Sequence, residues 1–242
     1  MADTPTDTSP QRYARIGGIL YLIIIVAGAT GELFVRGSLV VSGNAAATAH
    51  NILASRYLWR IGIAGDLLMH ICDVGLMLVF YVLLRRVNRN LAMLAILYNL
   101  VQTGVLVANK LTLVLPLFLL AEAPYLKAFT PEQLQALSYV AIRTHDYGFA
   151  FGLIFFGMEC MVIGYLIVRS KYLPRTLGRM MQIAGACYVL NSFAIVLYPP
   201  FGSKLFPFIL LPPFVAELSL ALWLLLKGVD VNKWPAAPTA YR

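Results

Sequence analysis

Residues 61–89 read IGIAGDLLMHICDVGLMLVFYVLLRRVNR, an apolar run that stops at Arg85, Arg86 and Arg89. A helix rises about 1.5 Å per residue, so about 20 apolar residues cross the hydrocarbon core of a bilayer. The run from Ile61 to Leu84 is therefore long enough to be a transmembrane helix. The three arginines mark the end of this helix because charged groups are costly in hydrocarbon.

Apolar runs recur along the chain from near residue 16 to residue 226, with brief polar interruptions. Hydrophobic residues make up 60% of the 242 residues and charged residues only 12%, which is unusual for a soluble domain. The other predicted spans cover residues 16–35, 91–120, 147–168, 180–197 and 206–226. We predict an all-α, polytopic membrane bundle of six transmembrane helices, plus a short outer amphipathic helix. The bundle should occupy residues 15–227, between a disordered cytoplasmic N-terminus at 1–14 and a loose cytoplasmic tail at 228–242.

Capping residues and prolines indicate where several helices begin and end. Thr130 can cap a helix, Pro131 suits its first position because no donor is needed there, and Gln133 completes a capping box. The helix that starts here should continue into the fourth span. Pro199-Pro200 should end the fifth span, and Pro212-Pro213 should kink the sixth.

The segment between the first two spans contains a further helix signal. Ser42 or Asn44 can cap a short helix over residues 45–55, which we predict to lie on the outer membrane surface. With the N-terminus inside, twelve Lys and Arg residues face the cytoplasm and six face outward. This asymmetry favours an orientation with both termini in the cytoplasm.

Several function classes are disfavoured by the sequence. The net charge is +8, but the Lys and Arg residues lie in short clusters between apolar runs, which is not typical of a nucleic-acid-binding face. The three cysteines lie within apolar runs, which argues against an extracellular disulfide framework. No phosphate-binding loop, nucleophile elbow or Cys-x-x-Cys pair occurs. The expected partner is the lipid bilayer, and the oligomeric state and any cofactor stay unknown.

The second span carries an ionisable stripe. Asp66, His70 and Asp73 are separated by four and three residues, which places their side chains on one helical face. Because charge is costly at membrane depth, this face must turn into the bundle. Asp73 should lie near the midplane, about 10 Å further along the helix than Asp66.

Other polar residues occur at comparable depth in the predicted spans. We expect Glu32 and Glu217 to join the stripe as candidate acid–base groups, beside Asp66, His70 and Asp73. The candidate ligand-binding residues are Lys110, Gln102, Asn109, His145, Asp146 and Asn191. Together these groups could line a polar cavity that opens to the outer side.

Four interpretations of the stripe remain open. It could be structural, with Asp66 or Asp73 paired to Lys110 to set helix register. It could bind a metal through Asp66, His70, Asp73 and His145, or a haem between the two histidines, although no HExxH signature is present. It could perform acid–base chemistry on a small lipophilic molecule, since a carboxyl group removed from water is a potential proton donor. It could relay protons or a cation in a transporter, although only the sixth span has an evident break.

Four stretches carry a resemblance to a known family. They are RYARIGGILYLIIIVAG (12–28), NAAATAHNILAS (44–55), DLLMHICDVGLMLVFYVLLRRVNRNLA (66–92) and GYLIVRSKYLPRTLGRMMQIAGACYVLNS (164–192). In their order and spacing they resemble the uncharacterised bacterial membrane family 4386 among the domains of unknown function. The resemblance covers roughly residues 12–226 and implies a bacterial inner-membrane protein of about six helices. It implies no activity. The intramembrane charges alone lead us to expect that the protein binds a small hydrophobic molecule, with acid–base transformation of that molecule as a further option.

Overall fold

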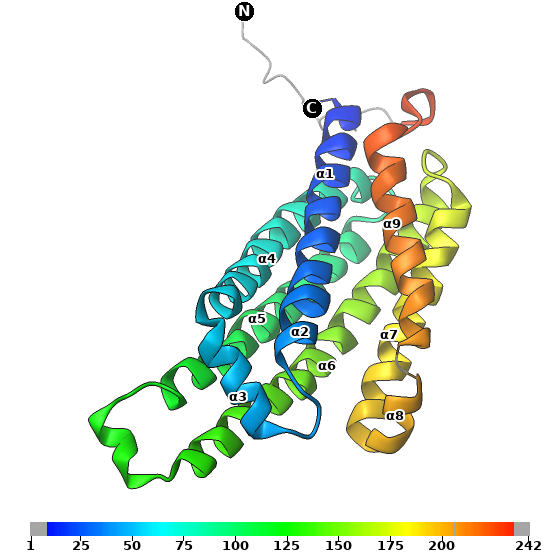
Figure 1. Ribbon diagram of the computed structural model, residues 1–242. Coiled ribbons are helices and arrows are strands. Elements are labelled where there is room, and N and C mark those ends of the chain that lie inside the picture. The colour runs from blue at the N-terminus through cyan, green and yellow to red at the C-terminus, as the bar shows by residue number, and fades with distance from the viewer. Residues whose placement is uncertain (1–8, 206, 235–242) are drawn as a thin grey trace, which may run out of the picture.

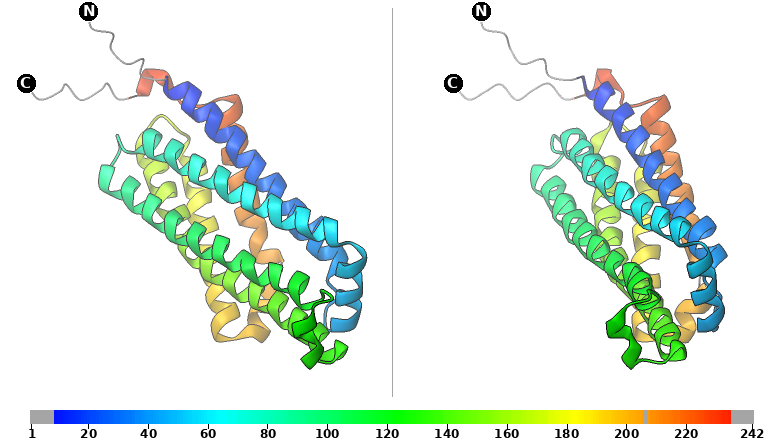
Figure 2. Two further views of the ribbon diagram at one scale, coloured as in Figure 1. Left: turned by 90° about the vertical axis from the view of Figure 1, so that its left-hand side faces the viewer. Right: turned by 60° about the vertical axis from the view of Figure 1, so that its left-hand side comes forward.

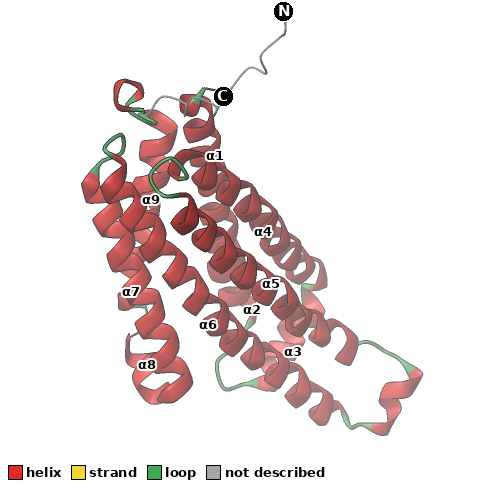
Figure 3. Cartoon of the chain, turned by 180° about the vertical axis from the view of Figure 1, so that it is seen from behind, coloured by secondary structure: helices red, strands yellow, loops and turns green. Residues whose placement is uncertain are grey.

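The computed structural model describes residues 9–205 and 207–234, and over these residues it contains helices and no strand (Figure 3). Six helical segments are long and apolar enough to cross a membrane. They cover Pro10–Leu39, Arg56–Leu84, Arg89–Leu119, Pro131–Ser170, Arg175–Leu197 and Phe208–Leu226. The predicted all-α bundle of six apolar helices is therefore confirmed.

The first span has three consecutive parts, α1 (Pro10–Ala29), the π-helical segment η1 (Thr30–Arg36) and α2 (Gly37–Leu39). Ser9 caps α1, and the proline that follows is suited to the first helical turn. The helix therefore starts earlier than expected, and residues 10–14 are helical rather than disordered. Residues 1–8 of the predicted disordered N-terminus lie outside the described residues.

Two predicted helix starts are found in the structure. Asn44 caps α3 (Ala45–Ala54), where its side chain accepts a backbone hydrogen bond of 2.9 Å. Thr130 and Gln133 form the capping box of α6 (Pro131–Ser170), with each side chain bonded to the other residue's backbone. In both cases the cap satisfies backbone N–H groups that have no partner within the first helical turn.

The second and third spans are α4 (Arg56–Leu84) and α5 (Arg89–Leu119). They are joined by a short turn that contains two of the three arginines expected there. The fifth span is α7 (Arg175–Leu197), and it is followed by the short helix α8 (Pro199–Leu205).

The sixth span differs from the prediction at its proline pair. After the turn η3 (Phe208–Leu210), α9 (Leu211–Leu226) begins with Pro212 and Pro213 in its first turn. The prolines therefore start this helix and do not kink it. Proline is tolerated at this position because the first N–H groups of a helix have no internal acceptor.

The segment after α9 is packed rather than loose as far as residue 234. Val229 is buried, and the backbone N–H of Asp230 donates to the carbonyl of Tyr172 over 3.0 Å. The ring of Trp234 lies 4.7 Å from that of Tyr172. The short helix η4 (Val231–Lys233) is thereby held against the bundle, and residues 235–242 lie outside the described part.

The helices pack as an elongated bundle (Figures 1 and 2). α1 packs against α4 and α9, α5 packs against α4 and α6, and α6 packs against α7. The beginning of α1, the α4–α5 turn, the α6–α7 turn and η4 lie at one end, which we call the N-terminal end (Figure 1). α3, α8 and η2 (Pro124–Ala128) lie at the opposite end.

Glycines allow the closest helix approaches. A Cβ atom on Gly164 would lie 2.5 Å from the carbonyl oxygen of Gly178, and one on Gly157 would lie 2.7 Å from that of Gly185. α6 and α7 therefore approach each other backbone to backbone. Gly152 of α6 faces Leu106 of α5.

Buried apolar side chains form two clusters separated along the bundle. The larger one, around Leu83, Leu166 and Leu220, lies toward the N-terminal end. The smaller one surrounds Trp59, whose indole Nε1 donates to the carbonyl of Leu113 over 2.8 Å. Along α4 and α5 the buried polar residues lie between these two clusters.

Candidate functional site

The ionisable stripe of α4 faces the bundle interior. Asp66, His70 and Asp73 are 1%, 2% and 6% exposed, whereas Leu68 and Ile71 on the other side of the helix are 52% and 70% exposed. The inward orientation predicted from the cost of charge in hydrocarbon is confirmed. The three residues of the stripe have different surroundings.

At its first position the stripe forms a buried ion triad of Arg36, Asp66 and Lys110. Asp66 Oδ2 lies 2.8 Å from Arg36 Nη1 and 2.9 Å from Lys110 Nζ. Lys110 Nζ also lies 3.2 Å from His145 Nε2, and the carbonyl of His145 accepts from Asn109 Nδ2 over 2.9 Å. Three spans and the end of η1 are thus tied together at this level.

Two predicted residues lie at the margin of the interior. The side chain of Glu32 is 61% exposed and pairs with Arg36 over 2.7 Å, so it touches the ion triad from outside. Asp146 is 47% exposed and pairs with Arg143 over 2.6 Å. The structure therefore does not bring Asp146 to the stripe, although it follows His145 directly, because consecutive helical residues point in different directions.

At its third position the stripe forms a carboxyl cluster of Asp73, Asn99, Thr103 and Glu159. Asn99 Nδ2 lies 3.1 Å from Asp73 Oδ2 and 3.1 Å from Glu159 Oε2, and Thr103 Oγ1 donates to Asp73 Oδ2 over 3.1 Å. Gln102 Oε1 lies 3.3 Å from the same Asn99 nitrogen. Two buried carboxyl groups therefore share one neutral amide donor.

A hydrogen-bonded pair, Tyr188 of α7 and Glu217 of α9, lies beside the carboxyl cluster. Glu217 is 8% exposed and accepts a hydrogen bond from Tyr188. Glu159 is close enough to both Asp73 and Glu217 to interact with them electrostatically. Asn191 is also buried, but its Oδ1 has no hydrogen-bond partner within the described residues.

The middle position of the stripe is different, because both ring nitrogens of His70 lack a hydrogen-bond partner within residues 9–205 and 207–234. The ring lies near enough to Lys110 and Asp66 to interact with their charges. Buried polar atoms are usually hydrogen-bonded, so an unpaired imidazole needs an explanation. Both ring nitrogens of His70 therefore have bonding capacity left for a further group.

Four contributing residues were missed or set aside in the sequence interpretation. Arg36 and Glu159 are not among the site residues predicted from the sequence. Asn99 and Thr103 are not among the predicted site residues either, although they lie four residues apart on α5 and share a helical face with Lys110, seven residues beyond Thr103. The periodicity argument applied to α4 would have found them on α5.

The residues considered for a metal do not gather as ligands. No three His, Cys, Asp or Glu side chains come together closely enough to hold a metal ion in the described part of the chain. The oxygens of Asp66 face two cations, and His145 faces Lys110. The side-chain geometry therefore gives no support to the metal interpretation.

Comparison with known proteins adds a family but no activity. An uncharacterized protein from Archaeoglobus fulgidus is 26% identical over 177 residues, which cover 73% of this chain and 89% of the relative. No solved structure matches the chain. The family model described as a domain of unknown function, DUF4386, matches residues 16–228. The chain is thus a multi-pass helical protein that belongs to the DUF4386 family.

Proposed function

We propose that the protein binds a small lipophilic molecule with a polar head between α4, α5 and α6, and that His70 contacts the polar head. The observation that carries this proposal is the buried imidazole with two unpaired nitrogens. A hydroxyl or carbonyl group of a ligand would satisfy one of them, which removes the cost of an unpaired buried polar atom. The apolar part of the molecule would enter from the bilayer.

The groups on either side of His70 support acid–base chemistry on such a molecule. Asp73 and Glu159 lie in the interior with neutral hydrogen-bond donors, and no Lys or Arg of the described residues pairs with them. A carboxyl group without a counter-charge in a dry interior is costly to ionise and can donate a proton. The ion triad then keeps the helices in register, so that a proton donor and an imidazole face the same ligand.

Thermal unfolding of the detergent-purified protein with a panel of lipophilic probes tests the proposal. The panel contains a short-chain quinone, a prenyl alcohol and a fatty acid. One class should raise the melting temperature in a saturable manner, because a ligand that binds only the folded state stabilises it. His70→Phe should lose this response while it keeps the fold.

Asp146→Asn is the matched control, since Asp146 is an exposed acid of the same bundle. It should respond to the probes as the unsubstituted protein does. The proposal is wrong if no class shifts the melting temperature, or if His70→Phe responds like the control.

A proton relay is a second candidate, and the continuity of the titratable groups favours it. Asp66, His70 and Asp73 follow one another along α4, and Asp73, Glu159 and Glu217 interact electrostatically across the bundle. Protein in liposomes that contain a pH-sensitive dye should conduct protons under an imposed membrane potential. Asp73→Asn should abolish this flux, and a flux equal to that of empty liposomes would exclude the relay.

We also propose that the N-terminal end faces the cytoplasm. The described Lys and Arg residues at this end are Arg12, Arg15, Arg85, Arg86, Arg89, Arg169, Lys171, Arg175, Arg179, Lys227 and Lys233. Asp230 is the only acidic residue among the described residues there. An excess of Lys and Arg favours retention of this end of the bundle on the cytoplasmic side of the membrane. A fluorescent reporter fused after residue 242 should be active in the cytoplasm, and a periplasmic phosphatase at the same position should be inactive.

A further inference from the structure

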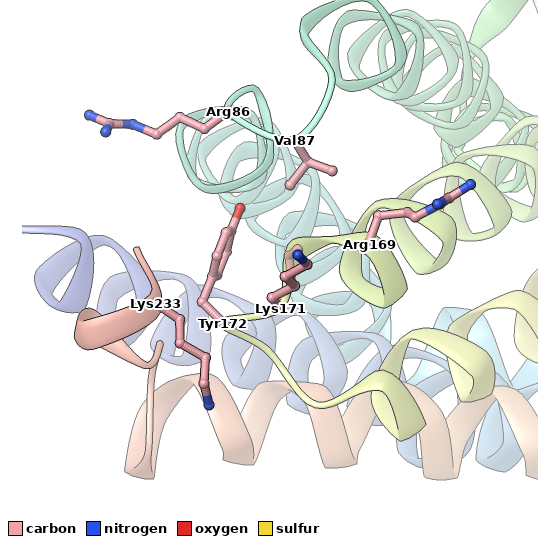
Figure 4. A pocket seen from close by; sticks show the side chains of 7 residues that line it. Arg86, Val87, Arg169, Lys171, Tyr172 and Lys233 are labelled. Atoms are coloured by element: carbon pink, nitrogen blue, oxygen red, sulfur yellow. The ribbon is translucent and has the colours of Figure 1, made fainter. Parts of the chain in front are cut away.

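A basic pocket opens at the N-terminal end, far from the stripe of α4. It has a volume of about 480 Å³ and is lined by Arg86, Val87, Arg169, Ser170, Lys171, Tyr172 and Lys233. These residues come from the α4–α5 turn, the end of α6 with the turn after it, and η4 (Figure 4). The volume lies in the range of small-molecule sites.

The pocket carries a large excess of positive charge. Lys233 has an acidic partner, Asp230, at 2.7 Å. Arg169 lies over the ring of Tyr165 at 5.5 Å, and no carboxylate of the described residues pairs with Arg169 or Lys171. In Figure 4 Arg86 and Arg169 extend to opposite sides of the pocket, with Lys171 between them. Arg169 and Lys171 can reorient toward an anion because no carboxylate of the described residues holds the tips of their side chains.

The floor of the pocket, in contrast, is rigid. Tyr172 is 2% exposed, and its hydroxyl donates to the carbonyl of Leu83. Ser170 Oγ donates to the carbonyl of Ile167 and accepts from the backbone N–H of Leu173. The backbone that carries the cations is therefore held in place by these hydrogen bonds, which lowers the conformational entropy lost on binding.

Lys171 occupies a backbone conformation that a lysine rarely adopts. It is the C-cap of α6 with a φ of 64°, the left-handed conformation that glycine usually supplies at helix ends. A glycine here would relieve strain but would remove a cation from the middle of the pocket. The strained lysine is therefore an independent indication that the charge at this position is used.

We propose that this pocket binds the phosphate group of an anionic molecule, with Lys171 and Arg169 as its charged contacts. Guanidinium and ammonium groups suit phosphate oxygens, to which they donate charge-assisted hydrogen bonds. The pocket lies where the spans end, which is the depth of lipid phosphates. A lipid headgroup and a free phosphate share this chemistry, and the experiment distinguishes them.

Binding is measured on the full chain in neutral detergent, by native mass spectrometry and by the melting temperature. One arm adds phosphatidic acid, a second adds phosphatidylcholine and a third adds inorganic phosphate. Saturable binding of phosphatidic acid above phosphatidylcholine assigns the site to a lipid headgroup, and a saturable response to inorganic phosphate alone assigns it to a soluble anion. Equal responses to both lipids, with none to phosphate, overturn the proposal.

Lys171→Gly is the decisive variant, because it should keep or raise the melting temperature while affinity for the anion falls roughly tenfold. The double variant Lys171→Gly with Arg169→Gln should weaken binding further. Lys127→Gln, which removes an exposed cation at the opposite end of the bundle, is the control and should bind normally. Anion affinity that is unchanged in Lys171→Gly and in the double variant refutes the proposal.

Discussion

Asp66→Asn should be among the most destabilising single substitutions in this bundle. Asp66 is 1% exposed and faces Arg36 and Lys110 at 2.8 and 2.9 Å. At an effective dielectric constant of about 20, each contact is worth roughly 6 kcal/mol before desolvation is subtracted. Removal of the carboxylate leaves Lys110 buried without a counter-charge, and breaking such a pair costs roughly 3–5 kcal/mol.

The expected effect can be measured as a melting temperature in detergent, with the buried Trp59 as the fluorescence probe. A loss of roughly 3–5 kcal/mol corresponds to a decrease of about 6–20 °C for a chain of this size. Addition of Lys110→Met to Asp66→Asn should restore at least half of the loss, because the buried unpaired cation is then gone and Arg36 keeps Glu32. The two substitutions should therefore be strongly non-additive.

Arg143→Gln is the control for this prediction. It breaks the exposed pair with Asp146, and exposed pairs contribute about 1 kcal/mol at most, so the melting temperature should change by no more than about 4 °C. If Asp66→Asn changes the melting temperature as little as this control, the ion triad does not hold the helices together. Additive losses in the double variant would show that Lys110 does not depend on Asp66.

Four further substitutions test the packing and one helix cap. Gly31→Ala should lower the melting temperature, because its Cβ would lie 2.6 Å from the carboxylate of the ion triad. Gly65→Ala is the control: its Cβ would have no neighbour within 4 Å among the described residues, so the melting temperature should stay the same or rise. Gly164→Ala should separate α6 from α7, because its Cβ would lie 2.5 Å from the carbonyl oxygen of Gly178; a distance between spin labels on the two helices that stays unchanged would contradict this. Thr130→Ala removes a helix cap and should cost about 1 kcal/mol, measured as faster amide hydrogen exchange in the first turn of α6.

Local sequence patterns were sufficient to predict the helices. The caps at Asn44 and Thr130 were predicted because the donors and acceptors of a cap lie within three residues of each other. The same locality explains one error, since a proline pair in an apolar run can either kink a helix or begin one. The start of α9 at Leu211 depends on the preceding turn η3, which the apolar pattern does not reveal.

The inward face of α4 was predictable because helical spacing determines which residues share a face and hydrocarbon penalises charge on any other side. The choice of partners was not predictable. The sequence is equally compatible with an ion pair between Asp66 and Lys110 alone. It is also compatible with Asp73 pairing with Lys110 instead of accepting hydrogen bonds from Asn99 and Thr103. These pairings join residues 26 to 44 positions apart, and they depend on the tilt and register with which whole helices pack. Composition and periodicity determine the length of each helix and its inward face, because both are properties of a single helix. The basic pocket, and the lack of hydrogen-bond partners for His70 among the described residues, depend on how several helices pack together.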